Sequence, residues 1–88
     1  MTQHSRPILT EADLRGLSEA WLLRLAMLYW ERENLTAAIK EFPTITGLSR
    51  SALSNILAGR GSIGGLAWLK IQEAIHVPLY SMWLEANQ

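Results

Sequence analysis

The side chains best suited to chemistry in this 88-residue chain gather in the stretch GLSRSALSNILAGRGS, residues 47–62. In a helix, Leu53, Ile56 and Leu57 of this stretch fall on one face, at positions i, i+3 and i+4. Projection at about 100° per residue places short, mostly polar side chains on the opposite face: Ser51, Asn55 and Ala58, with Ser54 beside them. Serine hydroxyls and asparagine carboxamides both donate and accept hydrogen bonds. This face is therefore suited to contact with a polar surface.

The major groove of DNA is such a surface. It is about 12 Å wide and admits a helix when the side chains that face the bases are short. Serine contacts several base edges, asparagine pairs with adenine through two hydrogen bonds, and arginine reads guanine or holds phosphate. Arg50 and Arg60 flank the polar face. We therefore predict a helix-turn-helix, in which the second helix lies in the groove and its N-terminal residues reach base edges.

Local signals place this recognition helix at about residues 50–58. Ser49 is a good N-cap, because its hydroxyl can accept from a backbone N–H of the first turn. Leu48 and Leu53 then occupy the two positions of a hydrophobic staple. Gly59 is expected to end the helix in the left-handed conformation. Ser62 or the residue after it is expected to cap the next helix.

The helix before it is predicted from LTAAIKEF, with Asn34 as its cap and with Leu35, Ala38, Ile39 and Phe42 turned inward. The motif as a whole then spans about residues 35–58. Pro43 is expected to stop the first helix, because proline lacks an N–H and restricts the residue before it. The turn to Gly47 becomes several residues longer than usual. Thr44 and Thr46 are expected to be exposed in it, where they contact phosphate or only fill the turn.

The remaining segments also read as helices. Thr10 is expected to cap one or two short turns that end near Gly16, after a loose arm at residues 1–9. Ser18 caps a helix at about residues 19–33 that is apolar on nearly all sides, with its inward stripe at Leu22, Leu25, Ala26 and Tyr29. Residues 65–75 form another helix, and Pro78 begins the last one. No segment alternates as a strand does, so we predict an all-α fold, with an arm and short helix at 1–17 and one domain at 18–88.

Composition narrows the function classes. The chain has no cysteine, no signal-peptide pattern and no apolar run long enough to cross a bilayer, so we expect a cytoplasmic protein without membrane association. His4 and His76 each lack a paired carboxylate or second ligand in sequence, so we expect neither an enzyme, nor a metal site, nor a cofactor. The formal net charge is zero, but residues 40–72 are mildly basic.

Residues 34–80 resemble the Cro and phage-repressor type of helix-turn-helix domain. The resemblance rests on the turn glycine Gly47, the aliphatic Leu48 and Leu53, the helix-ending Gly59, and WLKIQEAIHV as the family's fourth helix. It implies a compact five-helix domain, here with an additional N-terminal arm or short helix. The base-reading positions that it implies are Ser49, Arg50, Ser51, Ser54 and Asn55. Phosphate contacts fall near Arg60 and Ser62, and Lys40, Thr44 and Thr46 are further phosphate candidates.

We expect the protein to pair with a second copy, because one recognition helix reads too few base pairs to find a site in a genome. The interface is expected on the terminal helix, at Leu79, Met82 and Trp83, with the apolar helix from Trp21 to Trp30 as the other candidate. The function predicted is a homodimeric transcriptional repressor that occupies an inverted-repeat operator in double-stranded DNA, of phage or mobile-element origin. Two alternatives remain: an antitoxin that also grips a toxin protein, and a helical protein-interaction module without DNA affinity.

Overall fold

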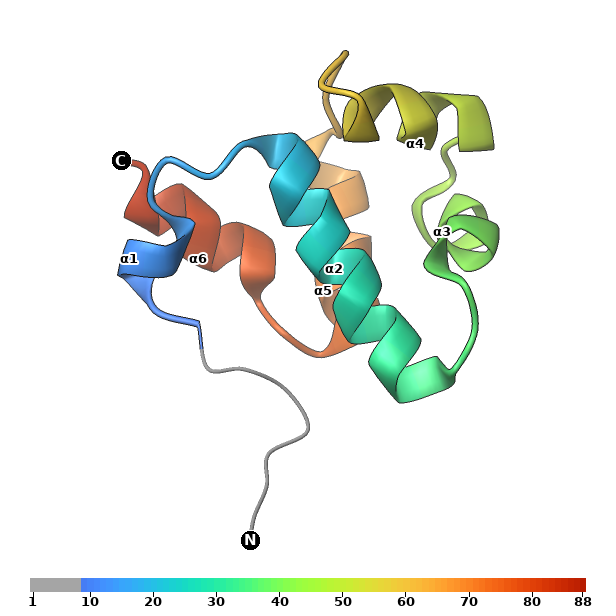
Figure 1. Ribbon diagram of the computed structural model, residues 1–88, viewed down its shortest axis with the longest axis horizontal. Helices are drawn as coiled ribbons and strands as arrows, with labels where there is room; N and C mark the ends of the chain where they lie inside the picture. The colour runs from blue at the N-terminus through green and yellow to red at the C-terminus, as the bar shows by residue number, and fades with distance from the viewer. Residues whose placement is uncertain (1–8) are drawn as a thin grey trace, which may run out of the picture.

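The computed structural model describes residues 9–88, which form six helices and no strand (Figure 1). The all-α prediction is confirmed for this part of the chain, and the predicted arm at residues 1–9 lies outside it except for Leu9. The helices are α1 (Glu11–Leu14), α2 (Glu19–Asn34), α3 (Ala38–Thr46), α4 (Arg50–Leu57), α5 (Gly65–Ile75) and α6 (Leu79–Ala86).

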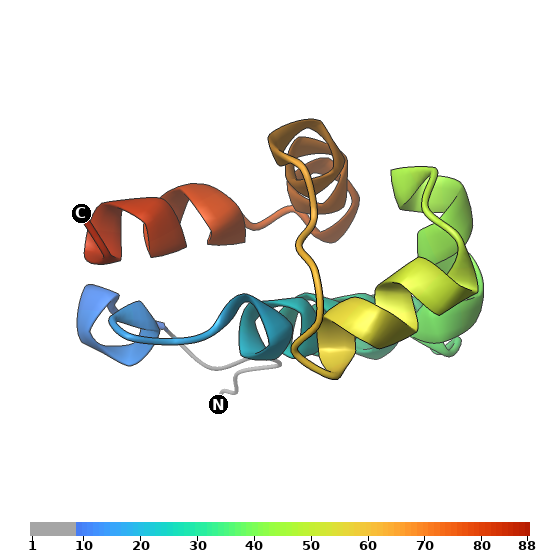
Figure 2. The same cartoon turned by 90° about the horizontal axis from the view of Figure 1, so that it is seen from above.

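The helices form two layers with a shared core. In Figure 2, α1 and α2 lie along the lower side, α5 and α6 lie along the upper side, and α3 and α4 lie at the right-hand end. Side chains from every helix meet between the layers, and Trp68 is the largest that is fully buried. Burying one such side chain stabilises the fold by about 1.5–3 kcal/mol. Leu14 of α1 is fully buried with the others, so the short first helix belongs to the core.

Three predicted N-caps are present. The Thr10 hydroxyl accepts from the Asp13 backbone N–H at 3.4 Å, and the Asp13 carboxylate accepts from the Thr10 N–H at 2.8 Å, which makes a capping box. The Ser18 hydroxyl accepts from the Trp21 N–H at the start of α2. Ser49 caps α4 by accepting from the Ala52 N–H at 3.0 Å. These caps satisfy N–H groups that have no partner inside their own helices.

The predicted start of α3 is wrong. Asn34 is the last residue of α2, and Leu35 follows it in the left-handed conformation with 89% of its surface exposed, so it does not point inward. The helix begins only at Ala38, and its N-cap residue Ala37 has no side chain that can cap. The Glu31 carboxylate of α2 accepts from the Ala38 N–H at 2.8 Å instead. A side chain seven residues away thus supplies the cap.

Pro43 does not stop α3, which continues to Thr46. A proline inside a helix lacks the N–H that would bond to the carbonyl four residues earlier, and its ring crowds that carbonyl. Buried Phe42 and Thr46 hold the last turn in place, and the Thr46 hydroxyl donates to the Phe42 carbonyl at 2.7 Å. The Gly47 N–H continues the pattern to the Pro43 carbonyl. The turn before α4 is therefore the three residues 47–49, with Gly47 at φ 78°, and the longer turn predicted from Pro43 is wrong.

Smaller corrections concern the other helix ends. Ser62 does not cap α5, because the chain bends in so that Ile63 is buried and Gly64 becomes the N-cap residue. Pro78 is the N-cap residue of α6 and not its first helical residue. In α2, Leu25 is only half-buried, whereas Leu23 and Met27 are buried because α2 packs on more than one side.

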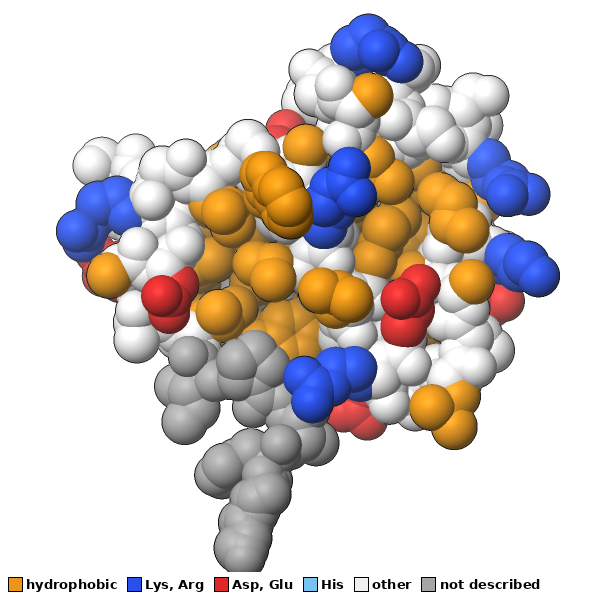
Figure 3. Space-filling model, viewed as in Figure 1, with side chains coloured by type: hydrophobic (Ala, Val, Ile, Leu, Met, Phe, Trp, Pro, Cys, Tyr) orange, Lys and Arg blue, Asp and Glu red, His pale blue; other side chains and the backbone are white. Residues whose placement is uncertain are grey.

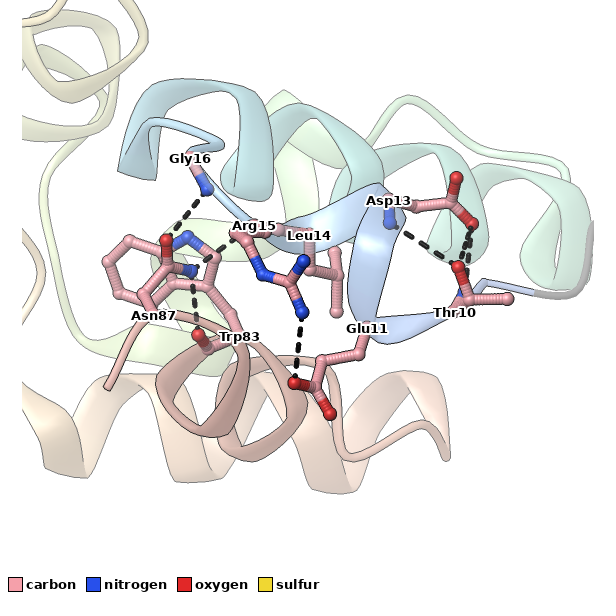
Figure 4. Close-up of polar contacts among 8 residues, drawn as sticks. All are labelled: Thr10, Glu11, Asp13, Leu14, Arg15, Gly16, Trp83 and Asn87. Atoms are coloured by element: carbon pink, nitrogen blue, oxygen red, sulfur yellow. Dashed lines mark hydrogen bonds and ion pairs between the residues drawn. The ribbon is translucent and has the colours of Figure 1, made fainter.

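A network of polar contacts joins α1 to the end of α6 (Figure 4). The Asn87 carboxamide donates to the carbonyl groups of Leu14 and Trp83, at 3.0 and 2.8 Å, and accepts from the Gly16 N–H at 2.7 Å. The indole Nε1 of Trp83 donates to the Leu17 carbonyl at 2.7 Å. The Leu14 and Trp83 carbonyls also accept from the backbone N–H groups of Leu17 and Asn87, so the Asn87 side chain adds a second bond to each.

Candidate nucleic-acid interface

The predicted recognition helix is α4, which forms an outer edge of the molecule with one side free (Figure 1). Its buried residues Leu53 and Ile56 lie against the core, and Leu48 of the turn also packs there. At the C-terminal end, the Arg60 N–H bonds to the Asn55 carbonyl and the Gly59 N–H to the Ile56 carbonyl. This is a Schellman motif, which needs the left-handed Gly59 at φ 86°. The N-cap Ser49 and the left-handed Gly59 are as predicted, and α4 ends at Leu57, one residue before its predicted end.

The outer face of α4 is polar, short and exposed. Ser51, Ser54 and Asn55 all point to solvent, opposite the buried Leu53 and Ile56. Within residues 9–88, neither the Ser51 nor the Ser54 hydroxyl makes a hydrogen bond. Their hydrogen-bonding capacity is free for another molecule.

Arg50 stands at the first position of α4, and that first turn holds no acidic residue. The N-terminal end of a helix carries partial positive charge, so a cation there is unfavourable for the isolated helix. No hydrogen bond or ion pair to another residue of 9–88 offsets this placement. The charge of Arg50 therefore has no role that the fold explains.

Asn55 and Arg60 form a pair at the other end of α4. A guanidinium N–H (Nη2) of Arg60 donates to Asn55 Oδ1 at 3.1 Å, in addition to the backbone bond of the Schellman motif. Both side chains are exposed. They border a hollow between α4 and the following loop, lined by Ala52, Asn55, Ile56, Arg60, Gly61 and Ser62. The structure thus brings together three of the predicted contact residues.

Glu19 of α2 holds the loop that carries Arg60 and Ser62 through hydrogen bonds. Its Oε2 accepts from the Ile63 N–H at 2.8 Å and from the indole Nε1 of Trp68 at 2.9 Å. Both donors are buried, and bonds from such groups to a carboxylate are among the stronger ones. Glu19 therefore positions the loop relative to α4.

A second residue of α2, Arg24, holds the end of the recognition helix. Its Nη2 donates to the Leu57 carbonyl at 3.2 Å, and its guanidinium lies 5.3 Å from the ring centre of Trp21. Sequence reasoning missed Arg24 and Glu19, because the partners lie 33 or more residues away and leave no local signal. The Asn55–Arg60 pair did have a signal, since a Schellman motif always brings the residue after its glycine beside the helix.

The remaining phosphate candidates separate into two groups. Lys40 and Thr44 are exposed, one turn apart on α3, and do not border the hollow beside α4. Thr46 is buried, and its hydroxyl donates to the Phe42 carbonyl while accepting from the Leu48 N–H at 3.1 Å. It is not exposed in the turn, contrary to the prediction. Thr46 holds the turn together and is no longer a candidate for phosphate contact.

The predicted dimer-interface residues are largely used inside the chain. Leu79 is fully buried, Met82 and Trp83 pack against the core, and α6 is covered by α1. The exposed apolar side chains of α2 include Trp21 at 60% and Leu28 at 55%. Hydrophobic side chains gather over this helix on the face shown in Figure 3. The second candidate interface is therefore the one with free apolar surface.

No three of the His, Asp and Glu residues within 9–88 lie close enough together to hold a metal ion. None of the helices in this range has the length and apolar content that crossing a bilayer demands. The pKa of Asp13 is lowered, first by the backbone N–H of Thr10 and then by its hydroxyl. That carboxylate lies in α1, so the shift reflects helix capping.

No protein-family model, curated protein or solved structure matches this chain. The function of this chain is therefore inferred from the geometry of α4 and its surroundings.

Proposed function

We propose that the protein is a sequence-specific DNA-binding transcriptional regulator, a dimeric repressor of the Cro and phage-repressor type that occupies an operator overlapping a promoter. The observation that carries the proposal is the outer face of α4. It presents short polar side chains with free hydrogen-bonding capacity at Ser51 and Ser54, on a helix that follows a three-residue turn. Helix-turn-helix motifs have turns of this length, often with a glycine.

Charge supports the same assignment. Between Phe42 and Gln72 the sequence has no acidic residue and three cations, Arg50, Arg60 and Lys70. Two of the three flank the polar face. A phosphate at the start of α4 would meet both Arg50 and the positive end of the helix dipole. The unfavourable placement of Arg50 in the free protein then becomes favourable in the complex.

The test is fluorescence anisotropy with mixed-sequence duplex DNA at about 50 and about 200 mM salt. Binding that releases counterions weakens steeply as salt rises. Arg50→Ala is expected to weaken binding to every sequence and to reduce the salt slope by about 1. The matched control is Arg15→Ala, which removes one charge from α1, where Arg15 pairs with Glu11. The control should bind as the wild type does. A wild type that binds no duplex at the lower salt would refute the proposal and favour a protein partner.

For the dimer we propose the stripe of α2 formed by the exposed Trp21 and Leu28 and the half-buried Leu25. On α6, by contrast, Leu79 is buried and Met82 and Trp83 pack against the core. Two copies would place recognition helices on half-sites roughly 34 Å apart. Sedimentation analysis of Leu28→Glu is expected to show monomers, while Leu84→Glu, which alters the exposed leucine of α6, leaves the dimer intact. The opposite result would place the interface on α6, and a monomeric wild type would exclude the dimer.

A further inference from the structure

We propose that Arg60 sets the base preference of Asn55 by placing a cationic N–H donor at its carboxamide oxygen, so that the pair presents mainly donors to DNA and selects guanine over adenine. The inference rests on the proposed DNA-binding function and adds to it the chemistry of one read base. It starts from the 3.1 Å bond between Arg60 Nη2 and Asn55 Oδ1.

The orientation of the carboxamide follows from the partner. A guanidinium has five N–H donors and no acceptor, so only the oxygen of Asn55 can face it. The amino group Nδ2 then points away from Arg60. No other hydrogen bond within residues 9–88 uses this amino group.

The pair is held by the backbone as well. The Arg60 N–H bonds to the Asn55 carbonyl at 2.7 Å, and the left-handed Gly59 fixes the bend between the two residues. Glu19 fastens the same loop three residues further on, at the Ile63 N–H. Arg60 therefore starts from a fixed point beside Asn55, which lowers the conformational entropy lost when the two side chains pair.

Base edges in the major groove distinguish the two states of Asn55. A free asparagine recognises adenine by donating to N7 and accepting from N6. The Asn55 oxygen keeps a second lone pair beside its bond to Arg60, but the guanidinium cation next to it repels the partly positive N6 amino group of adenine. Guanine presents acceptors at both N7 and O6, so it suits a cationic pair that mainly donates. The arginine thus turns an adenine reader into a reader of guanine.

The experiment is selection of preferred duplexes from a random library with the full chain, followed by affinities for duplexes that differ at one base pair. In the wild type, one position is expected to prefer guanine. Arg60→Ala should shift the guanine-to-adenine affinity ratio at that position toward adenine by at least about fivefold, the lower end of what a bidentate pair discriminates. Arg60→Lys is the control, because lysine keeps the charge and also only donates. It should keep the guanine preference.

Asn55→Ala completes the test. It should remove the preference at the same position, and Arg60→Ala in that background should then change affinity without changing base preference. If Asn55→Ala keeps the guanine preference, Arg60 reads the base itself and the proposal is wrong. If Arg60→Ala weakens all duplexes equally, Arg60 contacts only phosphate, and the proposal is again wrong. A wild type that binds no DNA is a different result, because it refutes the proposed function.

Discussion

Polar side chains have different roles in two regions of this molecule, the end where α1 meets α6 and the outer face of α4. At the α1–α6 end, Asn87, Trp83 and Thr10 bond to the protein's own backbone. Along the outer face of α4, Ser51 and Ser54 make no hydrogen bond within residues 9–88. A buried or capping polar group that loses its partner costs stability, whereas a solvated one costs little. The polar groups of the first end thus contribute to stability, whereas the hydroxyl groups of the α4 face are not used within the described residues.

Arg24 and Arg50, which lie at opposite ends of α4, extend this difference. Arg24 donates to the Leu57 carbonyl and so supports the helix from the protein side. Arg50 has no such contact within the described residues. Substitutions at the α1–α6 end should therefore change the free energy of unfolding, and substitutions on the α4 face should change binding.

The largest effect on stability is expected from Asn87→Ala. It removes two hydrogen bonds to the α1 region, worth about 1 kcal/mol each, and one exposed bond to the last turn of α6, so the free energy of unfolding should fall by roughly 2 kcal/mol. Urea denaturation measures it. The control Asn34→Ala removes a single exposed bond to the Trp30 carbonyl and should cost less than about 0.5 kcal/mol. Equal losses in the two variants would remove the distinction between the two ends.

Thr46→Val is expected to cost about 1–2 kcal/mol, because it keeps the shape of the side chain but removes the hydroxyl that bonds to Phe42 and Leu48. Thr44→Val is the matched control, since Thr44 is exposed on the same helix. Thermal or urea unfolding compares the pair. If Thr44→Val destabilises more than Thr46→Val, the turn is not held as the structure shows.

Three serines of the α4 region sharpen the comparison further. Ser49→Ala should lower stability by about 1 kcal/mol, because Ser49 caps α4. Ser51→Ala combined with Ser54→Ala should change it by less than about 0.5 kcal/mol, as surface substitutions do. Unfolding and DNA binding are measured on the same samples. A double variant as unstable as Ser49→Ala would show that this face already serves the fold.

The smallest effect is expected at Asp13. Its pKa is lowered in the folded state, so the carboxylate contributes stability above its ordinary pKa of 3.8, and this contribution is lost as the pH falls through the folded value. Asp13→Asn should therefore narrow the gap between the urea midpoints measured at about pH 6 and about pH 3. An unchanged gap would show that other carboxylates cause the acid sensitivity.

The sequence predicted the features that depend on neighbours a few residues away. Ser49, the Leu53 face and Gly59 were identified correctly, because cap, stripe and stop are local properties of a helix. The same reasoning failed at Pro43 and Leu35. There, local preference was overridden by the burial of Phe42 and by a cap that Glu31 supplies from another helix.

The sequence by itself thus determined the helical class, most helix positions and which side of α4 is polar. These features depend on helical periodicity and capping, which involve only residues within about one turn of one another. Only the tertiary structure places Glu19 against the loop after α4 and Arg24 against the last turn of α4. It also packs α6 against α1, so the apolar side of α6 faces the protein. These contacts join residues tens of positions apart. They exist only once the helices have packed, because packing is what brings their side chains within hydrogen-bonding distance.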